Sequence, residues 1–181
     1  MSRGAIGSDR RSVGAGSLRE IIMGAQDNLT TVLAVVLGVS IGSGELKAIA
    51  LAGMAAGVAE AISMGGVLYT ATRAERDLER NGDGPPSSGP LKDPVVAASV
   101  TFAAAIVAAA IPLSPFAVLP VRWATVTAAG LSVTCLFALG WWAGGVTGQH
   151  PFRGGLRFVA IGGFAALAAA LVGTVLRTNG S

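Results

Sequence analysis

Two acidic residues lie inside long apolar segments of this sequence, and their chemistry needs an explanation. Asp27 is in segment 21–42 and Glu60 is in segment 46–72, and no Lys or Arg lies at comparable depth in either segment. If these segments cross a bilayer, each charge costs at least about 2.5 kcal/mol on insertion scales. Each carboxylate then needs a functional role or a wet environment. The alternative is that both stay protonated and only hydrogen-bond neighbouring helices.

Both acids lie on narrow helical stripes of small residues. At about 100° per residue, Glu60 and Met64 share an arc of about 60° with Gly53 and Gly57. The same spacing predicts a second stripe in the first segment, made of Asp27, Thr31, Ala34 and Gly38. Small residues let helices approach closely, so Gly38, Gly53 and Gly57 are predicted to be helix-packing positions. Two such stripes, each with a carboxylate, favour close packing around a polar site.

The side chains on these stripes could bind a metal ion. At about 1.5 Å per residue, Asp27 and Met64 are expected at matching depth, with Glu60 about one turn deeper. Carboxylate oxygen together with thioether sulfur suits a borderline transition-metal ion, whereas Mg²⁺ and Ca²⁺ prefer oxygen alone. Carboxylates inside a membrane can equally carry protons. The three residues therefore predict a path for a divalent metal, for protons, or for both.

The elements that must position these residues are predicted to be membrane-spanning helices. Hydrophobic residues make up 52% of the 181 residues and charged residues only 13%, and the mean hydropathy is +0.64. A helix needs about 20 apolar residues to cross the hydrocarbon layer, and the alternation typical of barrels is absent. We expect an all-α membrane protein in a lipid bilayer with five transmembrane helices, at about 21–42, 46–72, 94–112, 121–146 and 156–176, which form one domain over 21–177.

The distribution of basic residues predicts the orientation. With the N-terminus in the cytosol, only Lys47, Arg122 and Arg177 of the 13 Lys and Arg residues lie outside. Five spans then put the C-terminus outside. Residues 1–20 are expected to form a disordered cytosolic tail, and 74–93 a cytosolic linker rich in Gly, Pro and Ser. The charge bias also explains the high pI, so no nucleic-acid partner is needed.

The sequence gives little support for an enzyme. It contains no Ser-His-Asp set, Cys-His pair or phosphate loop. The single cysteine, Cys135, lies inside the fourth span and is expected to be a packing residue. His150 precedes a proline in a predicted inner turn, where a polar loop residue is expected.

The segments "LREIIMGAQDNLTTVLAVVLGVSIG" and "AEAISMGGVLYTATRAERD" resemble the first two helices of the vacuolar iron transporter family. "DPVVAASVTFAAAIVAAAIPLSPF" resembles its third helix, and "RGGLRFVAIGGFAALAAALVG" its last. The resemblance implies a five-helix protomer in a homodimer, with the ion path near the dimer axis. It also implies export of Fe(II), and of other divalent metals such as Mn(II), from the cytosol in exchange for protons. No permanently bound cofactor is implied.

The resemblance assigns two of the site residues. Asp27 matches the aspartate of the family's "DGLT" motif, and Met64 matches the methionine of "SMG". Asn28 replaces the usual glycine after that aspartate. It is expected, with Thr31 and Ser63, to support the path. We expect a multi-pass protein of a prokaryotic plasma membrane.

Two departures from the family pattern favour a second hypothesis. The family often has a glutamate where this chain has Ala56, and Glu60, one turn further along, could take over its role. The long Glu-rich helices of members with a cytosolic metal-collecting domain are absent, because 74–93 is too short. The alternative function is therefore a non-transporting membrane scaffold or partner subunit that keeps the fold.

Overall fold

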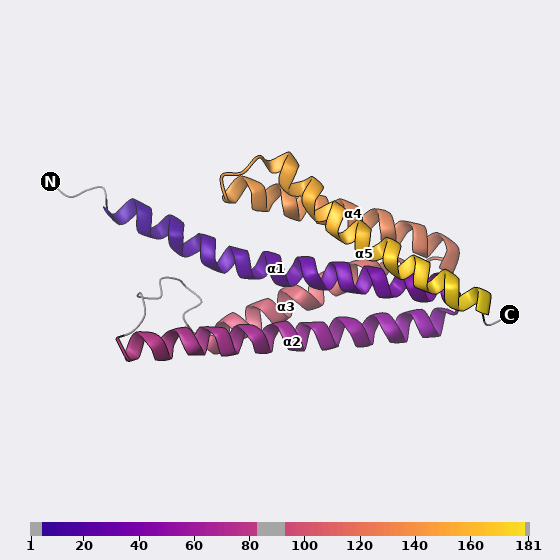
Figure 1. Cartoon of the computed structure of the whole chain (residues 1–181), viewed down its shortest axis with the longest axis horizontal. Helices are drawn as coiled ribbons and strands as arrows, with labels where there is room; N and C mark the ends of the chain where they lie inside the picture. The colour runs from indigo at the N-terminus through magenta and orange to yellow at the C-terminus, as the bar shows by residue number, and fades with distance from the viewer. Residues whose placement is uncertain (1–4, 83–92, 180–181) are drawn as a thin grey trace.

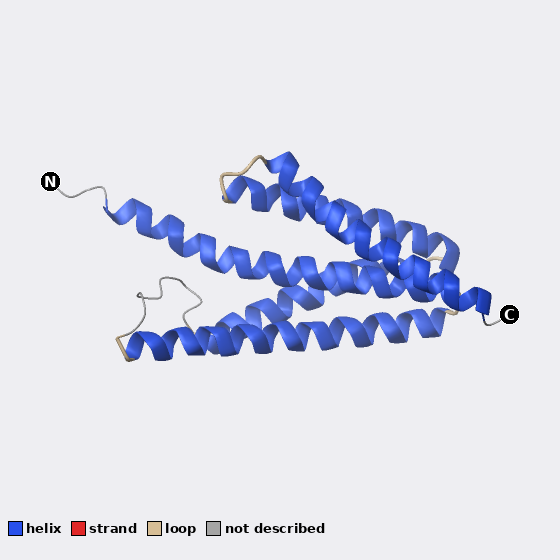
Figure 2. Cartoon of the chain, in the orientation of Figure 1, coloured by secondary structure: helices blue, strands red, loops and turns tan. Residues whose placement is uncertain are grey.

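The computed structural model describes residues 5–82 and 93–179, with side chains described within 21–82 and 93–177 except Met23. The described residues form five α-helices and one short 3-10 helix (Figure 1). These are α1 (Ala5–Gly42), α2 (Leu46–Arg80), α3 (Pro94–Leu113), η1 (Ser114–Ala117), α4 (Val121–Val146) and α5 (Pro151–Asn179). All five α-helices are long and apolar enough to cross a membrane. The expectation of an all-α fold with five helices able to span a membrane is confirmed for the described residues (Figure 2).

Several helices extend beyond the predicted spans. α1 begins at Ala5, where the sequence predicted a disordered tail over 1–20. α2 continues to Arg80 and so includes the first part of the predicted linker 74–93, whose residues 83–92 lie outside the described part of the chain. α5 begins at Pro151 rather than near 156. Adding a residue to an existing helix is inexpensive, and no proline interrupts 5–20 or 73–80.

Local sequence explains where helices begin and turn. Asp93 caps α3 by accepting hydrogen bonds from the Val95 and Val96 amides at 2.9 and 3.4 Å. Pro94 follows at the first helical position, where its missing N–H costs nothing. The tight turn between α1 and α2 uses Gly44 at a φ of +66°, a conformation that glycine adopts without steric cost.

α1 is the central element of the bundle. It contacts all four other α-helices, while α2 packs with α3 on one side and α4 with α5 on the other. Figure 1 shows α1 lying between these two pairs, with the chain termini at opposite ends of the molecule. Residues that face the interior from α1 are therefore enclosed by several helices at once. The most deeply buried ones are Leu29, Val32, Leu33 and Val36, all at most 1% exposed.

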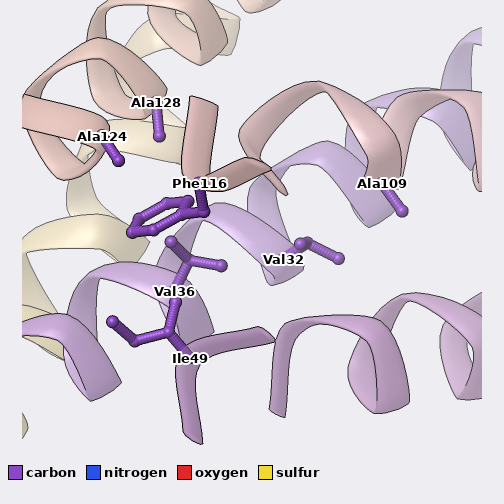
Figure 3. Packing of buried hydrophobic residues seen from close by; sticks show 7 residues of the cluster. All are labelled: Val32, Val36, Ile49, Ala109, Phe116, Ala124 and Ala128. Atoms are coloured by element: carbon purple, nitrogen blue, oxygen red, sulfur yellow. The ribbon is translucent and has the colours of Figure 1, made fainter. Parts of the chain in front are cut away.

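A small apolar cluster holds the helices together in the half of the bundle that is nearer the α1–α2 turn. Phe116 of η1 lies between Val36 and Ile49 on one side and Ala124 and Ala128 of α4 on the other (Figure 3). Val32 and Ala109 extend this cluster toward the middle of the bundle. The cluster contains no charged group, and Asp27 lies beyond it toward the N-terminal end of α1.

Candidate metal-ion site among α1, α2 and α3

The site is built where α1 and α2 run antiparallel and in close contact with α3. A Cβ added to Gly57 of α2 would lie 2.8 Å from the Ala109 Cβ and 3.3 Å from Val32 Cγ2. One added to Gly53 would lie 2.6 Å from Leu113 Cδ2 and 3.0 Å from Val36 Cγ2. The two glycines therefore lie at three-helix contacts. Because glycine has no side chain, α2 can approach α1 closely at these positions. The next turns of α2 then bring Glu60 and Met64 beside α1.

Asp27 and Glu60 come together at the α1–α2 contact. Their carboxyl groups lie close enough for a hydrogen bond and for charge repulsion between them. A hydrogen bond between two carboxyl groups requires that one of them carries a proton, because an ionised carboxylate can only accept. Asp27 is exposed on the surface of the protomer and Glu60 is half-buried. The pair is thus accessible from one face of α1 and α2.

Met64 reaches a different level of α1 from the one the sequence predicted. Its Cε lies 3.9 Å from the point where a Cβ on Gly24 would be. Depth counting had put Met64 level with Asp27 and Glu60 one turn deeper, whereas the structure pairs Asp27 with Glu60. The depth of each residue was counted from the predicted cytosolic end of its span. Both α1 and α2 continue past those predicted ends, so the two depths were not measured from the same level.

Asn28 is enclosed between α1, α2 and α3. Its side chain is fully buried, and its Nδ2 donates a 3.0 Å hydrogen bond to the Gly57 carbonyl oxygen. This bond ties α1 to α2 directly beside the Asp27 and Glu60 carboxyl groups. Among the described residues, its Oδ1 has no hydrogen-bond partner.

The remaining predicted site residues do not all face this contact. Thr31 is half-buried on α1, whereas Ser63 is exposed on α2. A Cβ on Gly38 would lie 3.0 Å from the Ala169 carbonyl oxygen, so Gly38 packs against α5 rather than α2. Ala56, the position of the missing family glutamate, is half-buried. The structure therefore brings Asp27, Asn28, Glu60 and Met64 together and leaves Ser63 and Gly38 apart from them.

Cys135 and His150 lie outside this region. Cys135 packs beside the apolar cluster formed by Leu29, Leu136 and neighbouring residues, and His150 is exposed in the turn between α4 and α5. Within 5–82 and 93–179, no three His, Cys, Asp or Glu side chains gather into a metal-binding group. Metal binding at Asp27 and Glu60 would accordingly need ligands of other types, such as the Met64 thioether and neutral oxygens.

Sequence reasoning missed one polar residue near this contact. Thr101 of α3 is 1% exposed, and its Cγ2 lies 2.8 Å from the same Gly24 position that Met64 approaches. Its signal in the sequence is weak but present: it is a hydroxyl residue within the alanine-rich segment "AASVTFAAAIVAAA". Threonine is common at helix contacts in membranes, so the type alone would not identify a site.

Together, the five helices and the carboxyl pair among them define a multi-pass membrane protein with a candidate ion site in its helical bundle. The family model of the VIT family matches residues 18–84 and 81–174. The chain belongs to the VIT family.

Two relatives extend this comparison. Vacuolar iron transporter homolog 1 of Arabidopsis thaliana is 29% identical over 157 residues, which cover 83% of this chain and 78% of the relative. The uncharacterized protein MJ0645 of Methanocaldococcus jannaschii is 26% identical over 160 residues, with 81% of this chain and 83% of the relative covered. The similarity therefore spans most of both chains rather than one segment.

Proposed function

We propose that this protein transports divalent transition-metal ions, Fe(II) and also Mn(II), out of the cytosol in exchange for protons. The observation that carries the proposal is the contact between the Asp27 and Glu60 carboxyl groups, with Met64 on the same helix face one turn from Glu60. Two carboxyl groups and a thioether match the preference of a borderline divalent ion. Family membership supports metal as the cargo.

Proton exchange follows from the chemistry of the carboxyl pair. A proton held between the two carboxyl groups in the absence of metal would relieve the cost of two adjacent negative charges in a bilayer. A divalent cation between them would stabilise both carboxylates and displace that proton. Metal binding and proton release would therefore occur at the same atoms, as exchange requires.

We further propose that the functional unit is a homodimer in a prokaryotic plasma membrane, with the N-terminus in the cytosol and the C-terminus outside. Asp27 is exposed on the single protomer, and a carboxylate that faces lipid is costly. A second protomer that covers Asp27 would remove this cost, which supports the proposed homodimer. Exposed small residues of α2, including Ala55, Ala59 and Gly66, offer a surface that a second protomer could approach closely.

Flux into liposomes tests the proposed function. Purified protein should carry Mn(II), and Fe(II) under reducing conditions, with a rate that depends on the imposed pH gradient. Asp27→Asn and Glu60→Gln should each reduce the rate by at least about tenfold, since each removes a charged ligand. Asp77→Asn, at an exposed acid of α2 outside the site, is the matched control and should leave the rate unchanged.

Failure of this test would favour the alternative function. If the wild-type protein shows no flux above empty vesicles for any first-row metal, transport is contradicted. A membrane scaffold or partner subunit then remains, and in that case Asp27→Asn and Glu60→Gln should leave the cellular phenotype unchanged.

A further inference from the structure

Two oxygen atoms at the three-helix contact are buried without a hydrogen-bond partner among the described residues. They are Oδ1 of Asn28, which is 0% exposed, and Oγ1 of Thr101, which is 1% exposed. A buried polar atom without a partner costs about 1–3 kcal/mol. The hydrocarbon around a membrane-spanning bundle supplies no substitute partner. The cost needs a compensating interaction.

Five helical threonines of this protein satisfy their hydroxyls within their own helix, whereas the buried hydroxyls of Thr101 and Thr30 have no partner among the described residues. The hydroxyls of Thr70, Thr125, Thr134, Thr147 and Thr174 each donate to the backbone carbonyl four residues earlier, at 2.7–3.1 Å. That local bond is the ordinary way for a helical threonine to satisfy its hydroxyl. Thr101 is also in a helix but makes no such bond. Its hydroxyl remains free to bind something else.

The amide of Asn28 is oriented by its one hydrogen bond. The Gly57 carbonyl oxygen can only accept, so the NH₂ group of Asn28 must face it. The Oδ1 atom is then left as a lone acceptor, 3.8 Å from the point where a Cβ on Gly57 would be. Its position is thereby fixed by α2, which also carries Glu60 and Met64.

The two residues that carry these oxygens lie near residues of the proposed path. Thr101 and Met64 both approach the same point at Gly24, and Gly24 is one helical turn before Asn28 on α1. Asn28 directly follows Asp27 in the chain. Asn28 and Thr101 are therefore buried among α1, α2 and α3, while Asp27 lies on the exposed face of the protomer.

We propose that Asn28 Oδ1 and Thr101 Oγ1 are neutral oxygen ligands that receive the divalent ion on the interior side of the path. The inference rests on the proposed function and adds α3 to the helices that form the site. A neutral oxygen replaces a water of the ion's hydration shell without adding charge, so it lowers the cost of dehydration and still allows release. Additional oxygen ligands also favour Mn(II) and Fe(II) over softer ions.

Metal binding to the purified wild-type protein and to hydroxyl-deleting variants tests this assignment. Mn(II) is the probe, with affinity measured by calorimetric titration and metal-free stability by thermal unfolding. Thr101→Val keeps the shape but removes the hydroxyl, and we expect it to weaken Mn(II) binding by about tenfold. Its metal-free melting temperature should stay the same or rise, because an unpaired buried hydroxyl is lost. Thr101→Ser should retain binding.

Two further variants sharpen the experiment. Thr125→Val makes the same chemical change at a threonine that is paired with its own helix, and it should leave Mn(II) affinity unchanged. Asn28→Leu removes the second oxygen and should weaken Mn(II) binding as Thr101→Val does. A threonine with only a structural role would not weaken Mn(II) binding on substitution while the metal-free melting temperature stays the same or rises.

The outcomes separate this inference from the proposed function. Wild-type binding with unchanged affinity in Thr101→Val and Asn28→Leu would overturn the inference and leave metal transport standing. A fall in the metal-free melting temperature of Thr101→Val, in parallel with its affinity, would assign the hydroxyl to packing and also overturn it. Absence of Mn(II) binding by the wild-type protein would overturn the proposed function and this inference together.

Discussion

Met64 and Met54 lie on the same helix but meet different surroundings. Met64 is half-buried and reaches Gly24 of α1, whereas Met54 is 54% exposed. Helical position predicts Met64 on the stripe of Glu60, and the family resemblance also matches Met64 to the methionine of "SMG". Side-chain type therefore could not decide which methionine belongs to the site, but helical position could.

This contrast gives a prediction for the thioether. Met64→Leu keeps the volume and removes the sulfur, and we expect Mn(II) or Fe(II) affinity to fall roughly fivefold, which corresponds to about 1 kcal/mol. The measurement is metal titration of the purified protein. Met54→Leu should have no effect. Equal affinities for the Met64→Leu and wild-type proteins would show that Met64 only packs.

Other features of the site could not be predicted from residue types. The sequence predicts facing stripes that carry Asp27, Glu60 and Met64, but it places Met64 rather than Glu60 level with Asp27, so the contact between the two acids came from the structure. The freedom of the Thr101 hydroxyl depends on which rotamer it adopts beside Gly24, and no sequence pattern specifies that choice. Ser63 was named as a supporting residue, yet it faces outward, because the helix turns it away from the Glu60 and Met64 stripe.

At the scale of elements, five helices could be predicted because lipid leaves the backbone few alternatives. Their partners could not. Gly38 is predicted to be a helix-packing position, but the sequence pattern does not identify the helix that it packs against. In the structure that helix is α5. α1 and α5 approach so closely that a Cβ on Gly173 would collide with the Gly38 backbone. This contact joins the first and last helices of the chain.

The α1–α5 contact predicts a stability difference between two glycines of the same helix. Gly173→Ala should destabilise the protein by about 1–3 kcal/mol, because the added methyl group has no space. Gly163→Ala is the control, since nothing lies within 4 Å of its added Cβ. Unfolding by denaturant in mixed micelles measures both. An equal effect of the two substitutions would contradict the close approach of α1 and α5.

At the scale of the whole molecule, the termini lie at opposite ends of the bundle (Figure 1). An odd number of spans requires this arrangement for any protein whose helices all cross the membrane. The fold itself does not determine which terminus lies in the cytosol, because it is compatible with either orientation in the membrane. The asymmetry of Lys and Arg favours the N-terminus in the cytosol.

Labelling with a membrane-impermeant thiol reagent tests the orientation. In a Cys135→Ala background, Ser181→Cys should react in intact cells, whereas Ser2→Cys should react only after the membrane is opened. The parent without cysteine is the control for background labelling. Labelling of Ser2→Cys in intact cells would reverse the predicted topology.

The central position of α1 has a consequence for biosynthesis. Of the five described α-helices, α1 is made before the other four, yet it packs against all of them, including α5. The surface of α1 that carries Gly38 therefore stays uncovered until α5 has been made. Folding that depends on contacts between distant parts of a chain is slow and exposes intermediates. A nascent chain that stops before α5 would leave α1 open to quality-control proteases.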